Sequence, residues 1–335
     1  MKYAESEGLR VEIRHGDTST KTRKRIVNTP PDILITTPES LGVILTSQKF
    51  LIALQELEWI IIDEVHELVS SERGTHLALS IERLQLVSKK TITRIGLSAT
   101  LSSPVETSKF VVGLGRKCAI LVDRSMREYD VEIKFVKGSL NNVATFIADY
   151  IKTNLIAGSV LLFTNTRDEA EYMGAILKNR DDSMVDVHHG SLSRNMREDT
   201  EHKLRAGLAE IVVCTSSLEL GLDIGSVQLV VHYGSPRQVS KLIQRIGRSR
   251  HRQSRSAKGL IVINNPDDEI EALALMKRMK RRSIEEQVMH KESLDVLAHH
   301  LVGLSIQAKK PIGLEPALDM VRKAYPFSTL SYHDM

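Results

Sequence analysis

Trp59-Ile60-Ile61-Ile62 is followed directly by Asp63-Glu64-Val65-His66, and this junction decides the fold. The apolar residues are too few for a helix and mostly β-branched, so they predict a buried parallel strand. Ligands of doubly wound sheets bind at the carboxyl ends of strands, which is where Asp63 and Glu64 stand. An acidic pair there is typical of the magnesium ligand and water-orienting carboxylate of a nucleotide-hydrolysing domain. The alternative is a pair that only caps the next helix.

Short β-branched segments alternate with amphipathic helical segments along most of the chain, which predicts two parallel-sheet α/β units. The first series of expected strands comprises Val11–Arg14, Ile33–Thr36, Trp59–Ile62 and Arg94–Leu97. The second comprises Val131–Val136, Ser159–Phe163, Met184–Val187, Glu210–Cys214, Val227–His232 and Gly259–Ile263.

A charged stretch, Asp123–Glu128, separates the two series, and the pattern after Asp267 is purely helical. Within that last part, leucines recur at helical spacing from Leu294 to Leu304. We therefore expect three domains, at residues 1–125, 126–285 and 286–335.

The composition is that of an ordinary soluble globular protein, with 41% hydrophobic and 26% charged residues. A net charge of +4 permits nucleic-acid binding but does not argue for it. Cys118 and Cys214 lie far apart in apolar stretches, so we expect both to be buried and neither a disulfide nor a zinc site to form. Neither a signal peptide nor a bilayer-length apolar run is present, which predicts a cytoplasmic protein without a membrane partner.

Small polar residues follow two further strands of the first series. Thr37 can cap a helix whose first position suits Pro38, which indicates either a simple capped helix or a contact to a phosphate backbone. Ser98-Ala99-Thr100 also follows a strand, as the acidic pair does.

In the second series, a strand leads into the hydroxyl-rich turn Thr215–Gly225. Asp223, between two glycines, is either a turn former or a partner of a ribose or an arginine. Further on, the segment Gln244–Arg252 is dense in arginine. It is either a solvated basic face or a surface facing phosphates, to which a planar guanidinium donates paired hydrogen bonds.

In this order and spacing, Asp63–His66, Ser98–Thr100 and Gln244–Arg248 resemble motifs II, III and VI of superfamily 2 helicases. Motifs Ib, IV and V are matched by Thr37–Ser40, Phe163–Arg167 and Thr215–Gly225. The resemblance to the large helicase-related (Lhr) group lies in four further segments, His15–Thr18, Glu72–Ser80, Leu218–Gly225 and Leu294–Ala298. The resemblance spans nearly the whole chain. It implies two RecA-like domains, the first truncated at its N-terminus, followed by the start of a helical, winged-helix domain.

The resemblance also implies a nucleotide site for ATP and Mg²⁺. Asp63 would hold Mg²⁺ through water, Glu64 would orient the attacking water, and Arg248 matches a finger arginine that stabilises charge on the transferred phosphoryl group. A second finger position falls on His251, where Arg245, Arg250 and Arg252 are neighbours that could compensate. The full set of cofactor-binding residues is Asp63, Glu64, Gly221, Asp223, Gln244 and Arg248.

By the same resemblance, a strand backbone would be contacted by Thr37, Pro38, Glu39, Thr164, Arg167 and Thr215. The residues that would couple the nucleotide cleft to the strand are His66, Ser98 and Thr100. The implied activity is ATP-dependent translocation on single-stranded nucleic acid, 3′ to 5′, on DNA in preference to RNA.

The chain also departs from many relatives in the first unit, because it contains no Gly-x-x-x-x-Gly-Lys-Ser/Thr phosphate loop. We interpret the sequence as a segment of a longer helicase that is inactive alone, since the amides and lysine that cradle the β- and γ-phosphates have no substitute. A degenerate paralogue is the alternative origin. The alternative function is a non-catalytic, nucleic-acid-binding remnant of a helicase.

Overall fold

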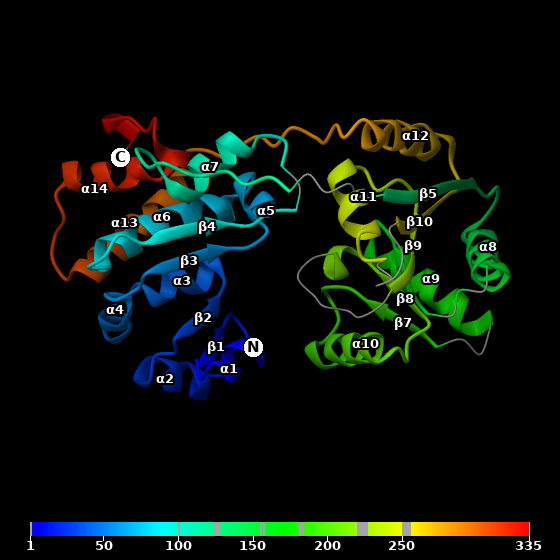
Figure 1. Cartoon of the computed structure of the whole chain (residues 1–335), viewed down its shortest axis with the longest axis horizontal. Helices are drawn as coiled ribbons and strands as arrows, with labels where there is room; N and C mark the ends of the chain where they lie inside the picture. The colour runs from blue at the N-terminus through cyan, green and yellow to red at the C-terminus, as the bar shows by residue number, and fades with distance from the viewer. Residues whose placement is uncertain are drawn as a thin grey trace. The chain divides into compact units, whose positions relative to one another are not determined.

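The computed structural model describes residues 2–99, 101–123, 128–154, 156, 158–180, 184–219, 227–249 and 256–334. The chain forms two compact units, the first comprising residues 1–122 and 286–335 and the second residues 123–285 (Figure 1). All strand pairs among the described residues are parallel, which confirms the predicted α/β fold class. No helix in the described part of the chain is long and apolar enough to cross a membrane.

The second unit is built on one six-stranded sheet with the strand order β5-β10-β9-β6-β8-β7. The bounds of its strands are β5 Glu128–Phe135, β6 Ser159–Phe163, β7 Val185–His188, β8 Ile211–Cys214, β9 Val227–Tyr233 and β10 Ser256–Ile263.

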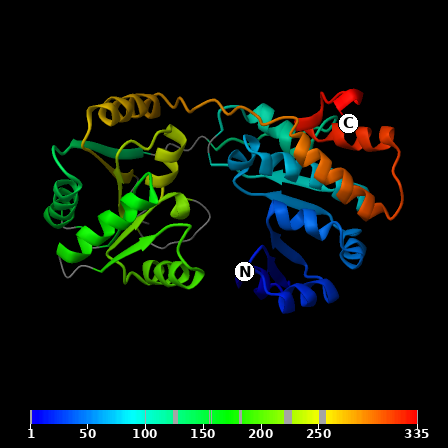
Figure 2. The ribbon, with the colours of Figure 1, turned by 180° about the vertical axis from the view of Figure 1, so that it is seen from behind.

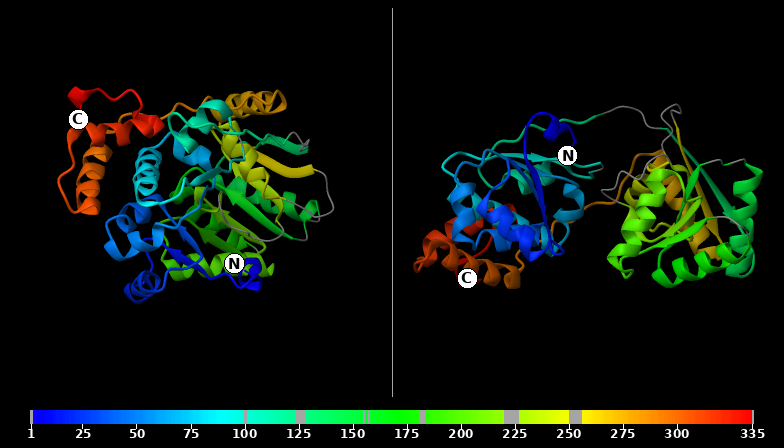
Figure 3. Two further views of the ribbon diagram at one scale, coloured as in Figure 1. Left: turned by 60° about the vertical axis from the view of Figure 1, so that its left-hand side comes forward. Right: turned by 90° about the horizontal axis from the view of Figure 1, so that it is seen from below.

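Helices cover both faces of this sheet (Figure 3). They are α8 Leu140–Thr153, α9 Arg167–Arg180, α10 Arg194–Ala206, α11 Val239–Ile246 and α12 Pro266–Lys280, with the short 3₁₀ turn η1 at Ser216–Leu218. The central strand β6 is buried at every position. Because side chains alternate along a strand, Val160 and Leu162 pack with α8 and α9, whereas Leu161 and Phe163 face the core that includes Leu204 of α10.

The strands of the first unit form two separate pairs, β1 with β2 and β3 with β4. Their bounds are β1 Val11–Arg14, β2 Ile33–Thr36, β3 Trp59–Ile62 and β4 Thr93–Gly96. The helices of this unit are α1 Lys2–Ser6, α2 Thr20–Asn28, α3 Pro38–Ile44, α4 Gln48–Leu54, α5 Val65–Val69, α6 Glu72–Val87, α7 Pro104–Val112, α13 Leu294–Ala308 and α14 Leu314–Lys323, followed by the 3₁₀ turns η2 Tyr325–Phe327 and η3 Tyr332–Asp334.

The helices α13 and α14 belong to the first unit, and α13 lies along α6 (Figures 1 and 2). Their apolar residues Leu297, Leu304 and Val321 join the core built by α5, α6 and α7. Residues 286–335 group with the first unit, because their apolar faces are buried on its helices. That they start a further, winged-helix domain stays a prediction.

A buried polar contact accompanies this packing. Arg83 of α6 donates from Nη1 to His300 Nδ1 at 3.2 Å and from Nε to Gln307 Oε1 at 3.1 Å. Burial and the neighbouring His76 and Arg83 lower the pKa of His300 to about 2, so its ring is neutral and can accept.

Each of the ten predicted strands is present, within three residues of its expected bounds. The prediction that both cysteines are buried is wrong for Cys118, which is exposed, and right for Cys214. Cys118 lies in an irregular segment after α7, and the apolar stretch around it pairs with no strand among the residues that the structure describes.

The first unit leaves one face of its strands uncovered. Ile13, Ile33, Ile35, Trp59 and Ile61 are each 40–62% exposed, although they alternate with residues that pack on helices. Burial of apolar surface is the main stabilising contribution to folding, at roughly 25 cal/mol per Å². The first unit therefore lacks stabilisation that the second unit gains from its central strands β6, β8 and β9, which are buried at nearly every position.

We expect the first unit to unfold locally more readily than the second. In native-state hydrogen exchange, the slowest amides of β1 to β4 should exchange faster than the slowest amides of β6, β8 and β9. Equal protection in the two sheets would refute this expectation.

Candidate functional site

Parallel pairing of β3 with β4 brings the acidic pair beside the Ser98 loop. The register matches Ile61 with Ile95 and Ile62 with Gly96. Beyond the strands, the N–H of Leu97 donates to the carbonyl of Ile62 at 2.8 Å, and the N–H of Val65 donates to the carbonyl of Leu97 at 3.0 Å. The loops that follow the two strands are thus held together by backbone hydrogen bonds.

Glu64 has a left-handed backbone conformation, with φ 49° and ψ 46°. This conformation is uncommon for a residue other than glycine and is frequent at functional sites. The N–H of Glu64 donates to Asp63 Oδ1 at 2.9 Å, which fixes the Asp63 carboxylate at the strand end. Asp63 is exposed and Glu64 is half-buried.

These carboxylates fit a metal ion that is held mainly through water. The described residues contain no cluster of three or more His, Cys, Asp or Glu side chains arranged around a metal position. An exposed carboxylate such as Asp63 suits Mg²⁺, which usually keeps several waters and takes one or two protein carboxylates.

His66 connects the acidic pair to the loop after β4. Its ring is only 3% exposed, and Nδ1 lies 2.9 Å from Ser98 Oγ and 3.4 Å from Glu64 Oε2. Nε2 lies 3.4 Å from Glu67 Oε1. The structure therefore brings together two of the three residues predicted to couple the site, His66 and Ser98, whereas Thr100 lies outside the described residues.

Thr37 caps α3, because its side chain accepts the N–H of Ser40 at 3.3 Å, and Pro38 is the first residue of that helix. The local geometry at Thr37 is therefore that of a capped helix, one of the two alternatives that the sequence indicated. Glu39 accepts from Arg73 Nε at 2.6 Å, and this hydrogen bond lowers the pKa of Glu39 to about 2. Any contact of Glu39 with a strand phosphate would have to involve its partner Arg73, because a carboxylate repels a phosphate.

In the second unit, Thr164 and Thr215 follow the adjacent strands β6 and β8. The N–H of Thr164 donates to the carbonyl of Cys214 at 2.9 Å, and its hydroxyl donates to the carbonyl of Thr166 at 2.8 Å. Thr164 is buried, so its hydroxyl serves the turn. Thr215 is half-buried, and Arg167 at the start of α9 is 68% exposed. Of the three residues of the second unit that were predicted to contact a nucleic-acid strand, Arg167 and Thr215 are accessible and Thr164 is buried.

Arg245, on α11, is buried in a polar cluster. Its Nη2 donates to Glu219 Oε2 at 2.9 Å, and its guanidinium lies 5.0 Å from the centre of the Phe163 ring. Arg245 Nη1 also contacts His232 Nε2. His232 Nδ1 lies 3.0 Å from the carbonyl of Gly234 and donates to it, which leaves Nε2 as the acceptor. Burial, and then Arg245, lower the pKa of His232 to about 3, as expected for a neutral ring.

Arg245 therefore stabilises the second unit and does not face solvent. Arg248, one turn further on, is half-buried and donates to the backbone carbonyl of Glu219 from Nη2 at 2.7 Å and from Nε at 3.2 Å. Gln244 is half-buried on α11, which ends at Ile246 before Arg248. The predicted residues Gly221 and Asp223, and the positions Arg250, His251 and Arg252, lie outside the described residues.

Sequence reasoning gave no role to Glu219, although its side chain and carbonyl hold both arginines. An acid flanked by Leu218 and Leu220, just after a buried strand, could have signalled a buried basic partner.

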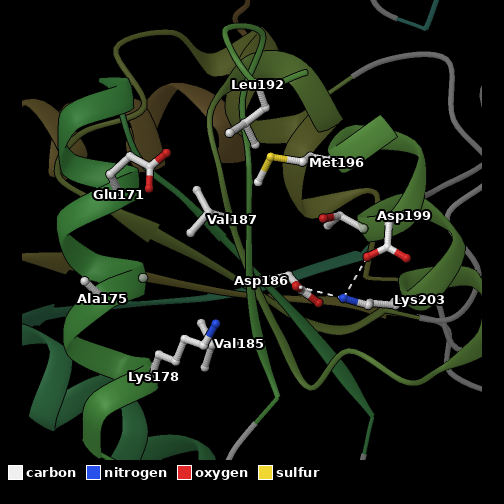
Figure 4. A pocket seen from close by; sticks show the side chains of 12 residues that line it. Glu171, Ala175, Lys178, Val185, Asp186, Val187, Leu192, Met196, Asp199 and Lys203 are labelled. Atoms are coloured by element: carbon white, nitrogen blue, oxygen red, sulfur yellow. Dashed lines mark hydrogen bonds and ion pairs between the residues drawn. The ribbon is translucent and has the colours of Figure 1, made fainter. Parts of the chain in front are cut away.

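A cavity of about 410 Å³ lies at the edge strand β7, between α9 and α10 (Figure 4). On one side of it, Lys203 lies 3.3 Å from Asp186 and 2.8 Å from Asp199. None of the predicted site residues lines this cavity. It is therefore separate from the candidate site.

An acidic pair after a parallel strand in one α/β unit and an arginine-bearing helix in a second one fit the RecA-like domains of superfamily 2 helicases. Two family profiles agree with this class. The "DEAD/DEAH box helicase" profile matches residues 1–108, and the "Helicase conserved C-terminal domain" profile matches residues 142–252.

Within this class, the chain belongs to the large helicase-related (Lhr) family. It is 40% identical to the ATP-dependent helicase Lhr-Core of Methanocaldococcus jannaschii over 98% of this chain and 39% of the relative. It is 33% identical to the Lhr helicase/uracil glycosylase of Escherichia coli over 96% of this chain and 24% of that protein. The chain thus spans less than half the length of these curated relatives.

A solved structure of Mycobacterium smegmatis helicase Lhr bound to ssDNA and AMP-PNP is similar to the whole fold. The TM-score is 0.88 and the identity 32%, over 99% of this chain and 45% of that one.

Arg245 and Arg248 should contribute differently to stability. We expect Arg245→Ala to lower the free energy of unfolding of the second unit by about 3 kcal/mol, because it leaves the buried Glu219 carboxylate unpaired. Arg248→Ala should lower it by about 1 kcal/mol or less, since Arg248 is half-buried and binds a carbonyl. Urea titration followed by circular dichroism measures both. Equal losses in the two variants would contradict the structural role of Arg245.

Proposed function

We propose that this chain is the motor part of an ATP-dependent helicase that translocates on single-stranded nucleic acid. The observation that carries the proposal is the joined acidic site of the first unit, in which His66 links Glu64 to Ser98. The Lhr relative solved with ssDNA and AMP-PNP supports both ligands. DNA in preference to RNA, 3′ to 5′ polarity and a cytoplasmic location are parts of the proposal that rest on sequence resemblance.

On the nucleotide side, Asp63 would hold the water shell of Mg²⁺, and Glu64 would orient water for attack. The metal–nucleotide complex supplies the phosphoryl group and neutralises part of its charge. The left-handed backbone of Glu64 turns the chain between β3 and α5, so neighbouring carboxylates can take different roles. Arg248 would contribute positive charge, and its contact with a backbone carbonyl can be exchanged for a phosphate oxygen.

On the strand side, the contacts would come from the ends of parallel strands and from helix starts. Arg167 and Thr215 in the second unit, and the capped start of α3 at Thr37 in the first, offer a guanidinium, a hydroxyl and helix amides. These groups bind sugar and phosphate and not base edges, which predicts binding with little sequence preference.

A second candidate function follows from the sequence, which contains no phosphate loop. A chain without that loop could bind a strand and hydrolyse no ATP. We propose that catalysis needs a phosphate loop in addition to the residues present here, and that this chain alone binds single strands without turnover.

The ATPase assay separates these functions. With single-stranded DNA, ATP and Mg²⁺, we expect no turnover by the 335-residue chain. In a longer protein that joins these residues to a phosphate loop, Glu64→Gln should lower kcat by about 10²-fold or more. Turnover by the 335-residue chain that disappears in Glu64→Gln would overturn the need for the loop. Unchanged kcat of Glu64→Gln in the longer protein would overturn the role of Glu64.

Strand binding should depend on salt and on Arg167. Each phosphate contact by a basic side chain changes the slope of log affinity against log salt concentration by about 0.7 for single strands. We expect Arg167→Ala to reduce the slope by that amount for DNA strands of any sequence, measured by fluorescence anisotropy. Arg180→Ala, at the other end of α9, is the matched control and should leave the slope unchanged. An unchanged slope in Arg167→Ala would exclude this contact.

A further inference from the structure

The helix that begins at the acidic pair is too short to stabilise itself. α5 has only five residues, and the last four carbonyls of any helix lack partners within it. In α5 these are the carbonyls of residues 66–69. Buried carbonyls need hydrogen bonds, so their partners show what holds the helix in place.

Two of these four carbonyls are bonded by one nearby residue, Ser71. The carbonyl of Leu68 accepts from the N–H of Ser71 at 3.0 Å and from its hydroxyl at 2.9 Å. The Ser71 hydroxyl also lies 3.3 Å from the carbonyl of Glu67. These contacts are local and close the end of α5 onto the start of α6.

The other two carbonyls are bonded by a segment more than 200 positions away in the sequence. Gln287 Nε2 donates to the carbonyl of His66 at 3.1 Å, and the N–H of His290 donates to the carbonyl of Val69 at 3.0 Å. Met289, between them, packs on the core of the first unit, whereas Val288 is 76% exposed. We call residues 287–290 the strap.

The strap also binds the loop after β4. The N–H of Gln287 donates to Ser102 Oγ at 2.9 Å, four residues after Ser98. Gln287 is thus bonded both to the helix that carries His66 and to the chain that follows Ser98. Gln287 therefore joins the same two segments that the contact between His66 and Ser98 joins.

The chain just before the strap is anchored in the second unit. The carboxylate of Glu285 accepts the N–H of Val239 at 2.7 Å and that of Ser240 at 3.2 Å. It therefore caps α11, the helix that carries Gln244 and Arg245 and leads to Arg248. Glu285 belongs to the second unit and Gln287 to the first, with only Glu286 between them in the sequence.

We propose that Glu285 and Gln287 are positioning residues that couple the arginine-bearing helix of the second unit to the acidic-box helix of the first through the connecting chain. The inference rests on the proposed function, because only a motor needs these two helices to respond to each other. Neither residue touches the reacting atoms. Gln287 acts through α5 and Glu285 acts through α11.

Hydrogen exchange measured by mass spectrometry tests the coupling on the full chain without requiring ATP turnover. The peptides to follow span residues 64–72 and 239–247, and a peptide spanning residues 159–163 of β6 reports intact folding. Gln287→Met keeps the side-chain length and removes the donor, Glu285→Ala removes the cap, and Val288→Ala is the matched control on the strap.

We expect Gln287→Met to speed exchange in residues 64–72 by about fivefold, as loss of one hydrogen bond predicts. Glu285→Ala should speed exchange in residues 239–247 and also, across the connection, in residues 64–72. The effect of Glu285→Ala on residues 64–72 should be smaller when Gln287→Met is also present. Val288→Ala should change exchange in neither peptide. If Gln287→Met disturbs β6, Ser102→Ala replaces it as the milder variant.

Exchange in residues 64–72 that is unchanged by both Gln287→Met and Ser102→Ala would overturn the positioning role of the strap. An effect of Glu285→Ala confined to residues 239–247 would show two independent caps and overturn the coupling. The ATPase assay tests the proposed function separately from the coupling. An ATPase result that excludes the role of Glu64 would leave these exchange results unaltered.

Discussion

Parallel strand pairing is the constraint on which both candidate surfaces depend. Parallel strands end at the same edge of a sheet, so the loops that follow neighbouring strands lie together even when they are far apart in the sequence. The pairing of β3 with β4 places Asp63 and Glu64 beside Ser98, 34 residues after Glu64, and the Leu97 backbone fastens the two loops. In the second unit the pairing of β6 with β8 does the same for Thr164 and Thr215.

Buried charges then divide the arginines into those that hold the fold and those that remain accessible. A buried guanidinium is costly unless a carboxylate and further hydrogen bonds compensate for lost hydration. Arg245 meets this condition through Glu219 and the neutral His232. In the first unit, Glu82 accepts from Arg94 at 2.7 Å and from Arg116 at 2.8 Å in the same way. Only arginines without such a cluster, such as Arg167, are available to a ligand.

The sequence predicted the positions of the strands well because short β-branched segments bounded by turn residues favour strands. The predicted burial of Trp59–Ile62 was wrong for Trp59 and Ile61, which are 58% and 62% exposed. The sequence also predicted that His66 and Ser98 share one site, since both follow strands and match ordered motifs. It gave the finger role to Arg248 but did not show that Arg245 is buried, because the carboxylate that pairs with Arg245 belongs to Glu219, 26 residues earlier. Cys118 was predicted to be buried because its neighbours are apolar. The prediction was wrong because apolar neighbours indicate burial only where their segment pairs with a strand. The docking of α13 and α14 on the first unit was missed for a related reason: helical spacing shows an apolar face but not the surface that covers it.

The strap shows that the acidic site is held in place by residues far from its own motif in the sequence. A five-residue helix has too few internal hydrogen bonds to fix its orientation, and helix formation is unfavourable until several turns exist. The orientation of α5, and with it that of Glu64 and His66, must therefore come from outside partners. One of them, Gln287, lies 221 residues from His66 and directly after the chain leaves the second unit. A helix held by the connecting chain, and not by its own length, can respond to changes in that chain. The shortness of α5 is thus a condition for coupling as well as a weakness in stability.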